Sequence, residues 1–277
     1  MTSWRLFPPQ TREVQVDEKW AFVGKKQRHC DPENPRDAKR GDHWDHVAFD
    51  AEHRLVLSVV PGKRTEANTR KLLQDVRARL GGRTPDLLTS DNYRPYRAAI
   101  LEAWGETVHP PRTGRRGRPR SPCTVPRPDL HYAIVHKTRK NGRVVRAYAS
   151  LNGLWPRRRV EPRVIFGNPA EVLALLARSP VSRKVNTAFV ERNNGTDRNR
   201  NARKVRRTYC FSKDWDIHEL FTYFTYYSYN FCWPVRTLRC PDEAGHWRNR
   251  TPAMSAALAD HVWSLAEWIS FPSVQQS

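Results

Sequence analysis

The sequence has few acidic residues for its number of basic ones. Its 277 residues include 28 Asp and Glu but 49 Lys and Arg, which gives a formal net charge of +21. A positive charge of this size repels itself unless it lies along a polyanion. Nucleic acid is therefore the partner we expect first, and an acidic membrane surface is the second candidate.

Long hydrophobic runs are also lacking. No apolar stretch approaches the roughly 20 residues that a membrane-spanning helix requires. The N-terminal stretch MTSWRLFPPQTREVQ has no apolar core of the kind found in signal peptides. We therefore expect a cytoplasmic protein that does not enter a membrane.

Cysteine is scarce and does not occur in a metal-binding or disulfide pattern. Cys30, Cys123, Cys210, Cys232 and Cys240 are odd in number and include no CxxC pair. Neither a disulfide framework nor a zinc ribbon is indicated, and we interpret all five as reduced thiols. The hydrophobic content of 38% and the ten Trp are still enough for a buried core, in one large domain or two small ones.

The N-terminal part shows strand patterns followed by alternating helix and strand patterns. Alternating apolar residues over 13–18, and apolar stretches over 46–49 and 54–60, predict three consecutive strands in an antiparallel meander. Apolar residues at three- to four-residue spacing over 66–80, stopped by a Gly-Gly pair, predict a helix. The stretch DLLTSD predicts a short strand, and a helix over 93–104 follows. This order indicates a mixed α/β fold.

The character of the chain changes beyond residue 110. The stretch PPRTGRRGRPRSP combines five arginines with proline and glycine, which predicts a loop or the boundary of an insertion. Strand patterns over 130–166 and a helix ending near Ser179 follow. A polar helix is expected over 187–205 and an aromatic helix over 217–231. The apolar stripe of the aromatic helix, which we expect to face the core, consists of Ile217, Leu220, Phe224, Tyr227 and Phe231.

Three acids stand out by their positions in these elements. Asp17 closes the first strand, Asp91 closes the DLLTSD strand, and Glu191 lies near the start of the polar helix. If the two strands are parallel neighbours, their carboxyl ends bring Asp17 and Asp91 together, and a helix across that edge delivers Glu191. Three carboxylates without basic partners repel, and a hard divalent cation such as Mg²⁺ relieves the repulsion. Taken singly, an Asp at a strand end is more often a turn or helix cap.

Four stretches occur in a fixed order across almost the whole chain, from Val14 to about Leu265: VDEKWAFVGKK, TSDNYRPY, NTAFVERNNGTDRNRNARKVRRTYCFSKDWDIHEL and RTPAMSAALADHVWSL. They resemble the catalytic region of the insertion-sequence-1-type DDE transposases. The resemblance implies an RNase H-like, retroviral-integrase-like mixed sheet flanked by helices. It also implies DNA strand cleavage and strand transfer with two Mg²⁺ ions, for which Mn²⁺ can substitute. By motif position, the catalytic and metal-binding acids are Asp17, Asp91 and Glu191.

The chemistry expected from this trio is phosphodiester substitution. One metal activates the attacking water or 3′-hydroxyl, and the other stabilises the leaving 3′-oxygen, so no covalent nucleophile is needed. A tyrosine relaxase would instead require a His-x-His pair beside its tyrosine, and the chain offers only His43-Trp44-Asp45-His46. That cluster, even with His29 and Cys30 nearby, does not have the pattern of a metal site.

Basic residues follow the third acid along the polar helix. Glu191 and Arg198 are seven residues apart and project from one stripe, with Gly195 between them. A face with so many cations interleaved with asparagine favours phosphate contacts. His218 is a candidate for supporting the carboxylates. The residues expected to bind DNA are Arg112, Arg115, Arg116, Arg118, Arg120, Arg192, Arg198, Arg200, Arg203, Lys204, Arg206 and Arg207.

The resemblance also organises the chain into parts. We expect an N-terminal tail (1–12), the first part of the core (13–111), a basic strand-rich insertion (112–186), the catalytic and aromatic helices that complete the core (187–240), and a C-terminal segment (241–277). Members of this family carry a zinc-binding segment and a helix-turn-helix ahead of the catalytic part, and here only about a dozen residues precede the first strand. A separately encoded end-recognition protein, or truncation of this copy, would account for the difference.

The expected partners are the transposon ends and the target DNA, with a homo-oligomer assembled on DNA. As a bacterial transposase the protein would associate with the nucleoid. Two alternatives remain open at this point. One is a truncated, non-catalytic DNA-binding protein that inhibits the full transposase, and the other is a nuclease of the same fold that cuts without joining.

Overall fold

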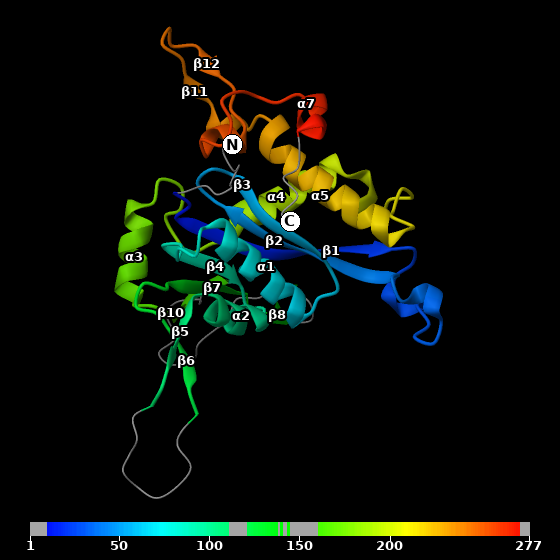
Figure 1. Cartoon of the computed structure of the whole chain (residues 1–277), viewed down its shortest axis with the longest axis horizontal. Coiled ribbons are helices and arrows are strands. Elements are labelled where there is room, and N and C mark those ends of the chain that lie inside the picture. Colours follow the sequence, from blue (N-terminus) through cyan, green and yellow to red (C-terminus); the bar gives the residue numbers. More distant parts are fainter. Residues whose placement is uncertain (1–9, 111–120, 138, 141–142, 145–159, 272–277) are drawn as a thin grey trace, which may run out of the picture.

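The computed structural model describes residues 10–110, 121–137, 139–140, 143–144 and 160–271. Within these residues six strands form one mixed sheet in the order β10-β7-β4-β1-β2-β3 (Figure 1). β1 pairs in parallel with β4, and β4 with β7, whereas the other neighbours are antiparallel. The strands of this sheet are β1 (Glu13–Val23), β2 (Gly41–Asp50), β3 (Leu55–Gly62), β4 (Leu87–Asp91), β7 (Tyr132–Lys137) and β10 (Val160–Phe166).

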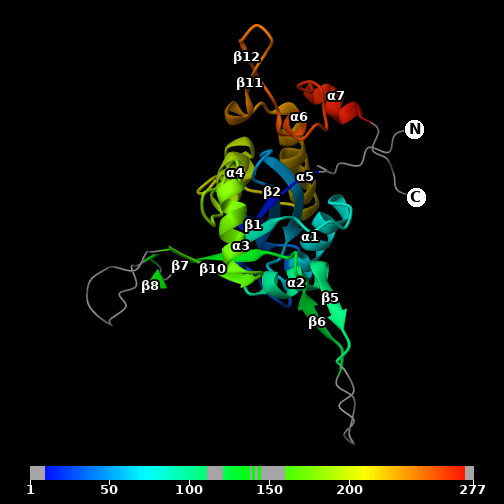
Figure 2. The ribbon, with the colours of Figure 1, turned by 90° about the vertical axis from the view of Figure 1, so that its left-hand side faces the viewer.

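Helices cover both faces of the sheet (Figure 2). Val14 and Val16 of β1 are fully buried on one face beneath α1 and α2. Val47 and Phe49 of β2 are buried on the other face, against α4 and α5, and α3 packs on that same side of β4 and β7. The helices of these layers are α1 (Glu66–Arg79), α2 (Pro95–Trp104), α3 (Pro169–Arg178), α4 (Ala188–Arg200) and α5 (Trp215–Cys232).

The expected meander and the first two helices are confirmed. β1, β2 and β3 pair consecutively and antiparallel. Thr65 caps α1 by accepting a hydrogen bond from Asn68 N, and Gly81 follows the helix with a φ of +62°, a conformation in which a side chain is strained. Capping and the terminating glycine are local features, so the bounds of α1 could be predicted from the sequence.

α4 ends at Arg200, earlier than the predicted end at Val205. Asn201 is extended and its side chain accepts a hydrogen bond from Arg203 N, which begins the 3-10 helix η3 (Ala202–Lys204). Asparagine side chains compete in this way with helical hydrogen bonds. The break turns Lys204 towards the interior, where it is 3% exposed.

The face that α5 buries is not the predicted apolar stripe. Ile217 and Leu220 are 45% and 64% exposed, so the prediction that they face the core is wrong, although Phe231 is buried as expected. The side chains directed towards the sheet include His218 and Thr222, which are 1% and 0% exposed. Polar groups already buried beneath α5 require polar partners there, and this requirement outweighs the burial of the apolar stripe.

Part of the region expected as a basic insertion belongs to the main sheet. β7 and β10 extend the sheet beside β4, and Leu130 and Tyr132 belong to its largest core. The preceding ribbon of β5 (Gly105–Val108) and β6 (Cys123–Pro126) extends away from the body (Figure 1). The arginines at 112–120 and the whole stretch 145–159 lie outside the described residues.

Short elements complete the described chain. The C-terminal helices α6 and α7 pack against the end of α5, where Phe231 and Trp263 share a small core.

All five cysteines lie in the described part and are free thiols, as expected. No described helix combines the length and apolar character needed to span a membrane. The remaining elements are β8 (Arg139–Lys140), β9 (Arg143–Val144), β11 (Cys240–Pro241), β12 (Trp247–Arg248), η1 (Gln27–His29), η2 (Pro35–Asp37), η4 (Arg236–Leu238), α6 (Pro252–Ser255) and α7 (Leu265–Ser270).

Candidate functional site

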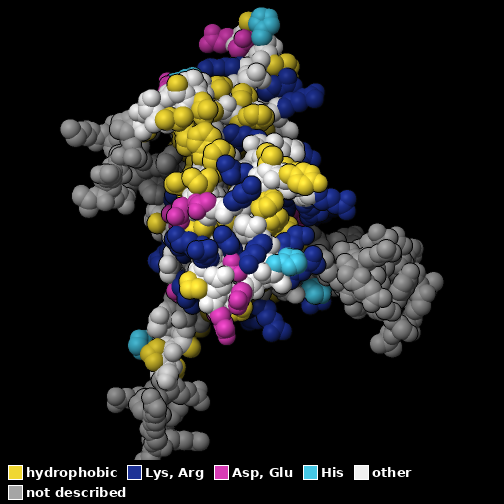
Figure 3. All heavy atoms as spheres, turned by 90° about the vertical axis from the view of Figure 1, so that its right-hand side faces the viewer, with side chains coloured by type: hydrophobic (Ala, Val, Ile, Leu, Met, Phe, Trp, Pro, Cys, Tyr) yellow, Lys and Arg dark blue, Asp and Glu magenta, His cyan; other side chains and the backbone are white. Residues whose placement is uncertain are grey.

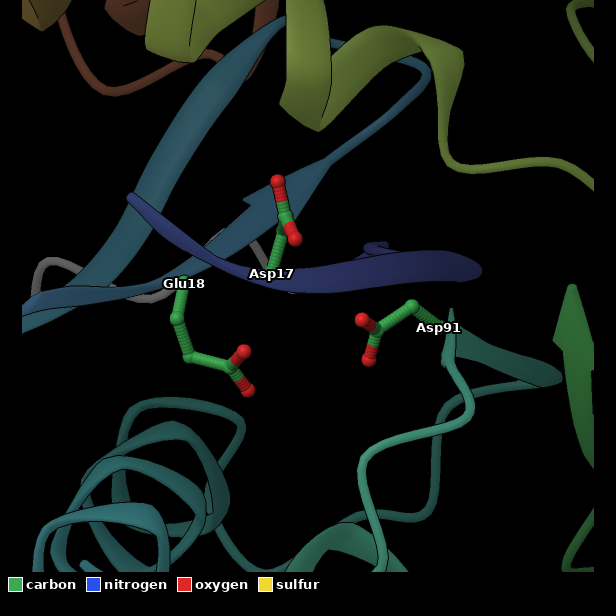
Figure 4. A group of neighbouring side chains, drawn as sticks. All are labelled: Asp17, Glu18 and Asp91. Atoms are coloured by element: carbon green, nitrogen blue, oxygen red, sulfur yellow. The ribbon is translucent and has the colours of Figure 1, made fainter. Parts of the chain in front are cut away.

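Asp17 and Asp91 meet where the parallel strands β1 and β4 separate. The parallel pairing ends at Val16 and Ser90, and the next residue of each strand is one of the two acids. Glu18, the neighbour of Asp17, completes a group in which one carboxylate oxygen from each residue lies within 4.8 Å of the others. We call Asp17, Glu18 and Asp91 the carboxylate cluster (Figure 4).

The members of the carboxylate cluster approach from different directions. In Figure 4 the Asp17 side chain points towards α4, while the Glu18 and Asp91 carboxylates lie on the other side of β1 and face each other. Successive residues of a strand point to opposite faces, so Asp17 and Glu18 reach one centre only because β4 ends beside them. Asp91 Oδ1 also accepts a hydrogen bond from Tyr93 N at 3.0 Å, so Asp91 has the turn-capping role as well.

Asp17 is the electrostatically strained member of the cluster. Burial, followed by the charges of Asp91, Glu18 and Glu191, raises the pKa of Asp17 to about 7. Asn194 of α4 donates a hydrogen bond to Asp17 Oδ2 at 2.9 Å. A carboxyl group held among like charges is stabilised in its ionised form by a nearby cation.

Glu191 lies near the carboxylate cluster but is not a member of it. It occupies the first turn of α4, where Thr187 Oγ1 donates a hydrogen bond to Glu191 Oε1 at 2.8 Å. Its charge contributes to the raised pKa of Asp17. The structure therefore brings Asp17 and Asp91 together and leaves Glu191, an exposed residue, beside them on the crossing helix.

Three residues on one face of β1 contact α4. Gln15 Oε1 accepts hydrogen bonds from the backbone N–H groups of residues 189 and 190, at 3.0 and 3.1 Å, which satisfies donors that a helix start leaves unpaired. Asp17 takes the hydrogen bond from Asn194, and Lys19 forms an ion pair with Asp197. Gln15, Asp17 and Lys19 share a strand face, and this set of contacts fixes where Glu191 lies relative to Asp17.

Lys19 also belongs to a second group of charges, which lies entirely inside the protein. Its ammonium group contacts Asp45 at 3.1 Å, and Lys204 contacts the same Asp45 oxygen at 2.7 Å. Lys19, Asp45, Asp197 and Lys204 are each at most 4% exposed, and we call them the buried ion network. Burial opposes ionisation of Asp45, but the two ammonium groups outweigh it and lower the Asp45 pKa.

Two of the predicted functional residues are part of this interior. Lys204 is buried and its ammonium group also donates to Thr222 Oγ1 at 2.5 Å. It is therefore not available to phosphate, and the expectation that it binds DNA is wrong. His218 does not support the carboxylate cluster. It shares a hydrogen bond with Ser212 Oγ at 2.8 Å, and burial and the charge of Lys204 lower its pKa to about 4. His218 is therefore neutral at pH 7 and lies against the buried ion network.

Other basic residues of this region remain on the surface. Arg192, Arg198 and Arg206 border a hollow of about 610 Å³ over the outer side of α4, and Gly195 lies in its floor. A Cβ atom at Gly195 would meet nothing within 4 Å, so the glycine widens the hollow. Arg198 Nε is buried and makes no hydrogen bond with a described residue. Figure 3 shows Lys and Arg side chains gathered across the middle of one face.

Arg200 and Arg203 are partly committed to protein contacts. Arg200 donates to Thr225 O at 2.6 Å and to Ser228 Oγ at 3.1 Å, which ties α4 to α5. The Arg203 guanidinium lies 5.2 Å from the centre of the Phe221 ring. Both arginines line a second hollow of about 670 Å³, which also includes Tyr209, a residue 97% exposed. Arg207 is exposed and has a φ of +59°.

The carboxylate cluster suits a hard divalent cation. Its three carboxylates offer only oxygen ligands, which Mg²⁺ and Mn²⁺ accept. Burial and then the neighbouring carboxylates raise the pKa of Asp17, and a cation beside it would favour its ionised form. The sequence reasoning missed Glu18, because a strand residue next to Asp17 is expected to face away from it. The missed signal was the acidic pair Asp17-Glu18 at the strand position where β4 ends.

No protein family and no curated protein matches the chain. Three solved structures of Mos1 transposase are similar over 37% of it, each with a TM-score of 0.22. They are the strand transfer complex (20% identity, 39% of that chain), the paired-end complex with left transposon end, and the mariner paired-end complex with Mn (each 16% identity, 41% of that chain). The matched part thus spans about two fifths of each Mos1 chain, and a TM-score of 0.22 does not establish a common fold.

Proposed function

We propose that the chain is a DDE-type transposase of the insertion-sequence-1 type, with an RNase H-like fold, that cleaves DNA strands and transfers them. The observation that carries the proposal is the meeting of Asp17, within β1, and Asp91, the last residue of β4, with Glu191 on a helix that crosses beside them. The motif resemblance singles out the same three residues. The antiparallel meander followed by two parallel strands, with helices on both faces, fits this fold.

In this proposal Asp17, Asp91 and Glu191 hold two Mg²⁺ ions, or Mn²⁺ in their place. When bound, such metals activate the attacking oxygen and stabilise the leaving 3′-oxygen of the phosphodiester. Asn194 orients Asp17 by its hydrogen bond to Oδ2, and Tyr226 donates to Asn194 Oδ1 at 3.3 Å. Because Gln15, Asp17 and Lys19 of β1 all hold α4, Glu191 is kept beside the cluster.

The DNA surface of the proposed enzyme is the outer side of α4. The hollow bordered by Arg192, Arg198 and Arg206 lies over α4, the helix that carries Glu191, and in this proposal a phosphate backbone bound there extends from the hollow to the acids. Arginine contacts of this kind hold DNA without reading its sequence. Transposon ends and target DNA are the proposed partners, with a homo-oligomer on DNA and a separately encoded protein for end recognition.

The direct test is strand cleavage and joining on labelled DNA with Mg²⁺ or Mn²⁺. The isosteric changes Asp17→Asn, Asp91→Asn and Glu191→Gln should each lower the rate by about 10³-fold or more, since they remove metal ligands that act on the transition state. DNA affinity should stay the same or rise slightly. A suitable control is Glu52→Gln, because Glu52 pairs with Arg12 at 2.5 Å away from the cluster.

The outcomes separate the alternatives. Cleavage without joining by the parent chain would indicate a nuclease of this fold. DNA binding without cleavage under any metal would indicate a non-catalytic DNA-binding protein. Substantial cleavage by one of the three acid variants would remove that residue from the proposed catalytic set.

A further inference from the structure

Glu18 is the member of the carboxylate cluster that the DDE motif does not include. Its side chain is only 2% exposed, and one of its oxygens lies within 4.8 Å of ligand oxygens of Asp17 and Asp91. Arg64 donates a hydrogen bond to Glu18 Oε2 at 3.0 Å. The other oxygen, Oε1, is buried and has no hydrogen-bond partner among the described residues.

A buried carboxylate oxygen without a partner is costly, because its hydration is lost and not replaced. The buried hydroxyl of Tyr96 faces Glu18 and favours its ionised form, although neither this hydroxyl nor Glu18 Oε1 has a partner at full hydrogen-bond geometry. Burial raises the pKa of Glu18, and the charge of Asp91 raises it further against the opposing effects of Tyr96 and Arg64. The protein alone therefore leaves Glu18 incompletely compensated.

The three carboxylates share one arrangement. One oxygen of each accepts a hydrogen bond from the protein: Asp17 from Asn194, Glu18 from Arg64, and Asp91 from Tyr93 N. Such bonds orient ligating carboxylates in metal sites. One oxygen of each residue also lies within 4.8 Å of the others, which is close enough for a single cation to contact all three.

The anchor of Glu18 is itself connected to Asp91. The Arg64 guanidinium lies 4.0 Å from the centre of the Tyr93 ring, and the backbone N–H of Tyr93 is the group that holds Asp91 Oδ1. Glu18 and Asp91 are thus positioned by one local unit, which explains how a residue from the opposite side of β1 can be aimed at the same point.

We propose that Glu18 is a third protein ligand of the divalent cation bound by Asp17 and Asp91, with Arg64 holding its other oxygen. This deepens the proposed function, on which it rests for the presence of a cation at the cluster. It also gives the middle of β1 two successive ligands, one from each face of the strand, where the motif alone assigns one.

The test measures Mn²⁺ binding to the full chain without DNA, from the loss of the free Mn²⁺ signal in electron paramagnetic resonance. Glu18→Gln keeps the shape of the side chain and an oxygen for Arg64, and should weaken Mn²⁺ binding by about 10- to 100-fold. Asp17→Asn and Asp91→Asn should weaken it at least as much. Glu52→Gln, which alters another glutamate paired with an arginine, should bind Mn²⁺ as the parent does.

Thermal unfolding distinguishes a ligand from a merely structural ion pair. In the absence of metal, Glu18→Gln should melt at the parent temperature or higher, because one of the repelling charges is removed, and Mn²⁺ should no longer raise its Tm as it raises that of the parent. Unchanged Mn²⁺ binding in Glu18→Gln, with binding lost in Asp17→Asn and Asp91→Asn, would overturn the assignment of Glu18 alone. Unchanged binding in all three variants would overturn the metal site and the proposed function with it.

Discussion

Asp17 of the carboxylate cluster and Lys19 of the buried ion network lie two residues apart on one face of β1, but the charges of the two groups are compensated differently. The network contains two cations, Lys19 and Lys204, and two anions, Asp45 and Asp197, and all four side chains are inaccessible. The cluster contains three carboxylates and one neighbouring cation, Arg64. The first group is neutral within itself, whereas the second has an excess of negative charge.

The difference distinguishes a structural group from a candidate site. Buried charges that are paired and hydrogen-bonded hold elements in one arrangement, and removing one partner leaves an uncompensated charge. Like charges kept together are unfavourable in the folded protein and imply a ligand that removes the repulsion. The ion pair between Lys19 and Asp197 thus holds α4 in place, and α4 is the helix that carries Glu191 beside the cluster.

Breaking the network should have the largest effect on stability. Asp45→Ala leaves both Lys19 and Lys204 without their shared partner, and the free energy of unfolding should fall by about 3–5 kcal/mol, as for other broken buried pairs. Urea unfolding measures the change. Asp216→Ala removes an exposed pair with Lys39 and should leave the unfolding midpoint nearly unchanged. A similarly small effect of Asp45→Ala would show that the network is not structural.

Neutralising the cluster should stabilise the metal-free protein. The Asp17 pKa of about 7 lies above the unfolded value of 3.8, so the folded state binds more protons between these values, and stability falls as the pH rises through this window. Asp17→Asn has no carboxyl group at this position, so its stability should not fall in this pH window for the same reason. At pH 8 in EDTA it should be more stable than the parent by up to about 4 kcal/mol, with the difference vanishing near pH 4. A pH-independent difference would contradict the cause assigned here.

A bound metal ion should offset the repulsion between the carboxylates in the parent protein and stabilise it. A cation that binds only the folded state adds about 2.7 kcal/mol to the free energy of unfolding at a hundred times its Kd. Millimolar Mg²⁺ or Mn²⁺ should therefore raise the Tm of the parent, and not that of Asp17→Ala. Asp197→Ala, which weakens the network and leaves the cluster intact, should still show a metal-dependent rise. Equal shifts in the parent and Asp17→Ala would place the metal elsewhere.

The smallest expected effect concerns the surface over α4. Replacing Arg192 and Arg206 by Ala should lower the slope of log K against log salt for duplex DNA by up to about 2, since each neutralised phosphate contributes about 0.9. Preference between unrelated sequences should change little. Lys71→Ala with Arg77→Ala, on α1 at the opposite face of the sheet, is the matched control. If the control pair lowers the slope equally, DNA does not follow α4.

The closeness of Asp17 and Asp91 could be predicted from the sequence, but not its full cause: β1 continues to Val23, so the expectation that Asp17 closes its strand is wrong. Alternation of apolar residues marks β1, and the short apolar run ending in Asp91 marks β4. Parallel pairing of these strands places Asp17 beside Asp91, because the pairing stops at Val16 and Ser90, where β4 ends. The arginines predicted at 112–120 lie outside the described residues, so their DNA contacts stay a prediction.

The burial of α5 and of Lys204 could not be predicted in the same way. The helical spacing of Ile217 and Leu220 marks an apolar stripe, but Lys19 and Asp45 already occupy the sheet face beneath α5, so its polar residues Thr222 and His218 are turned inward. Lys204 follows a basic run and looks like a surface cation in the sequence. Only the break at Asn201 brings its ammonium group to Asp45.

At the candidate site, the orientation of Glu18 follows from the sequence, whereas its closeness to Asp17 and Asp91 depends on the tertiary structure. Strand periodicity determines that residues 17 and 18 point to opposite faces, and for an isolated strand this separates the two acids. The early end of β4 opens the space into which both side chains extend, and Arg64, from beyond the end of β3, holds Glu18 in place. Periodicity is a property of one segment, whereas the closeness of three carboxylates depends on where a neighbouring strand stops.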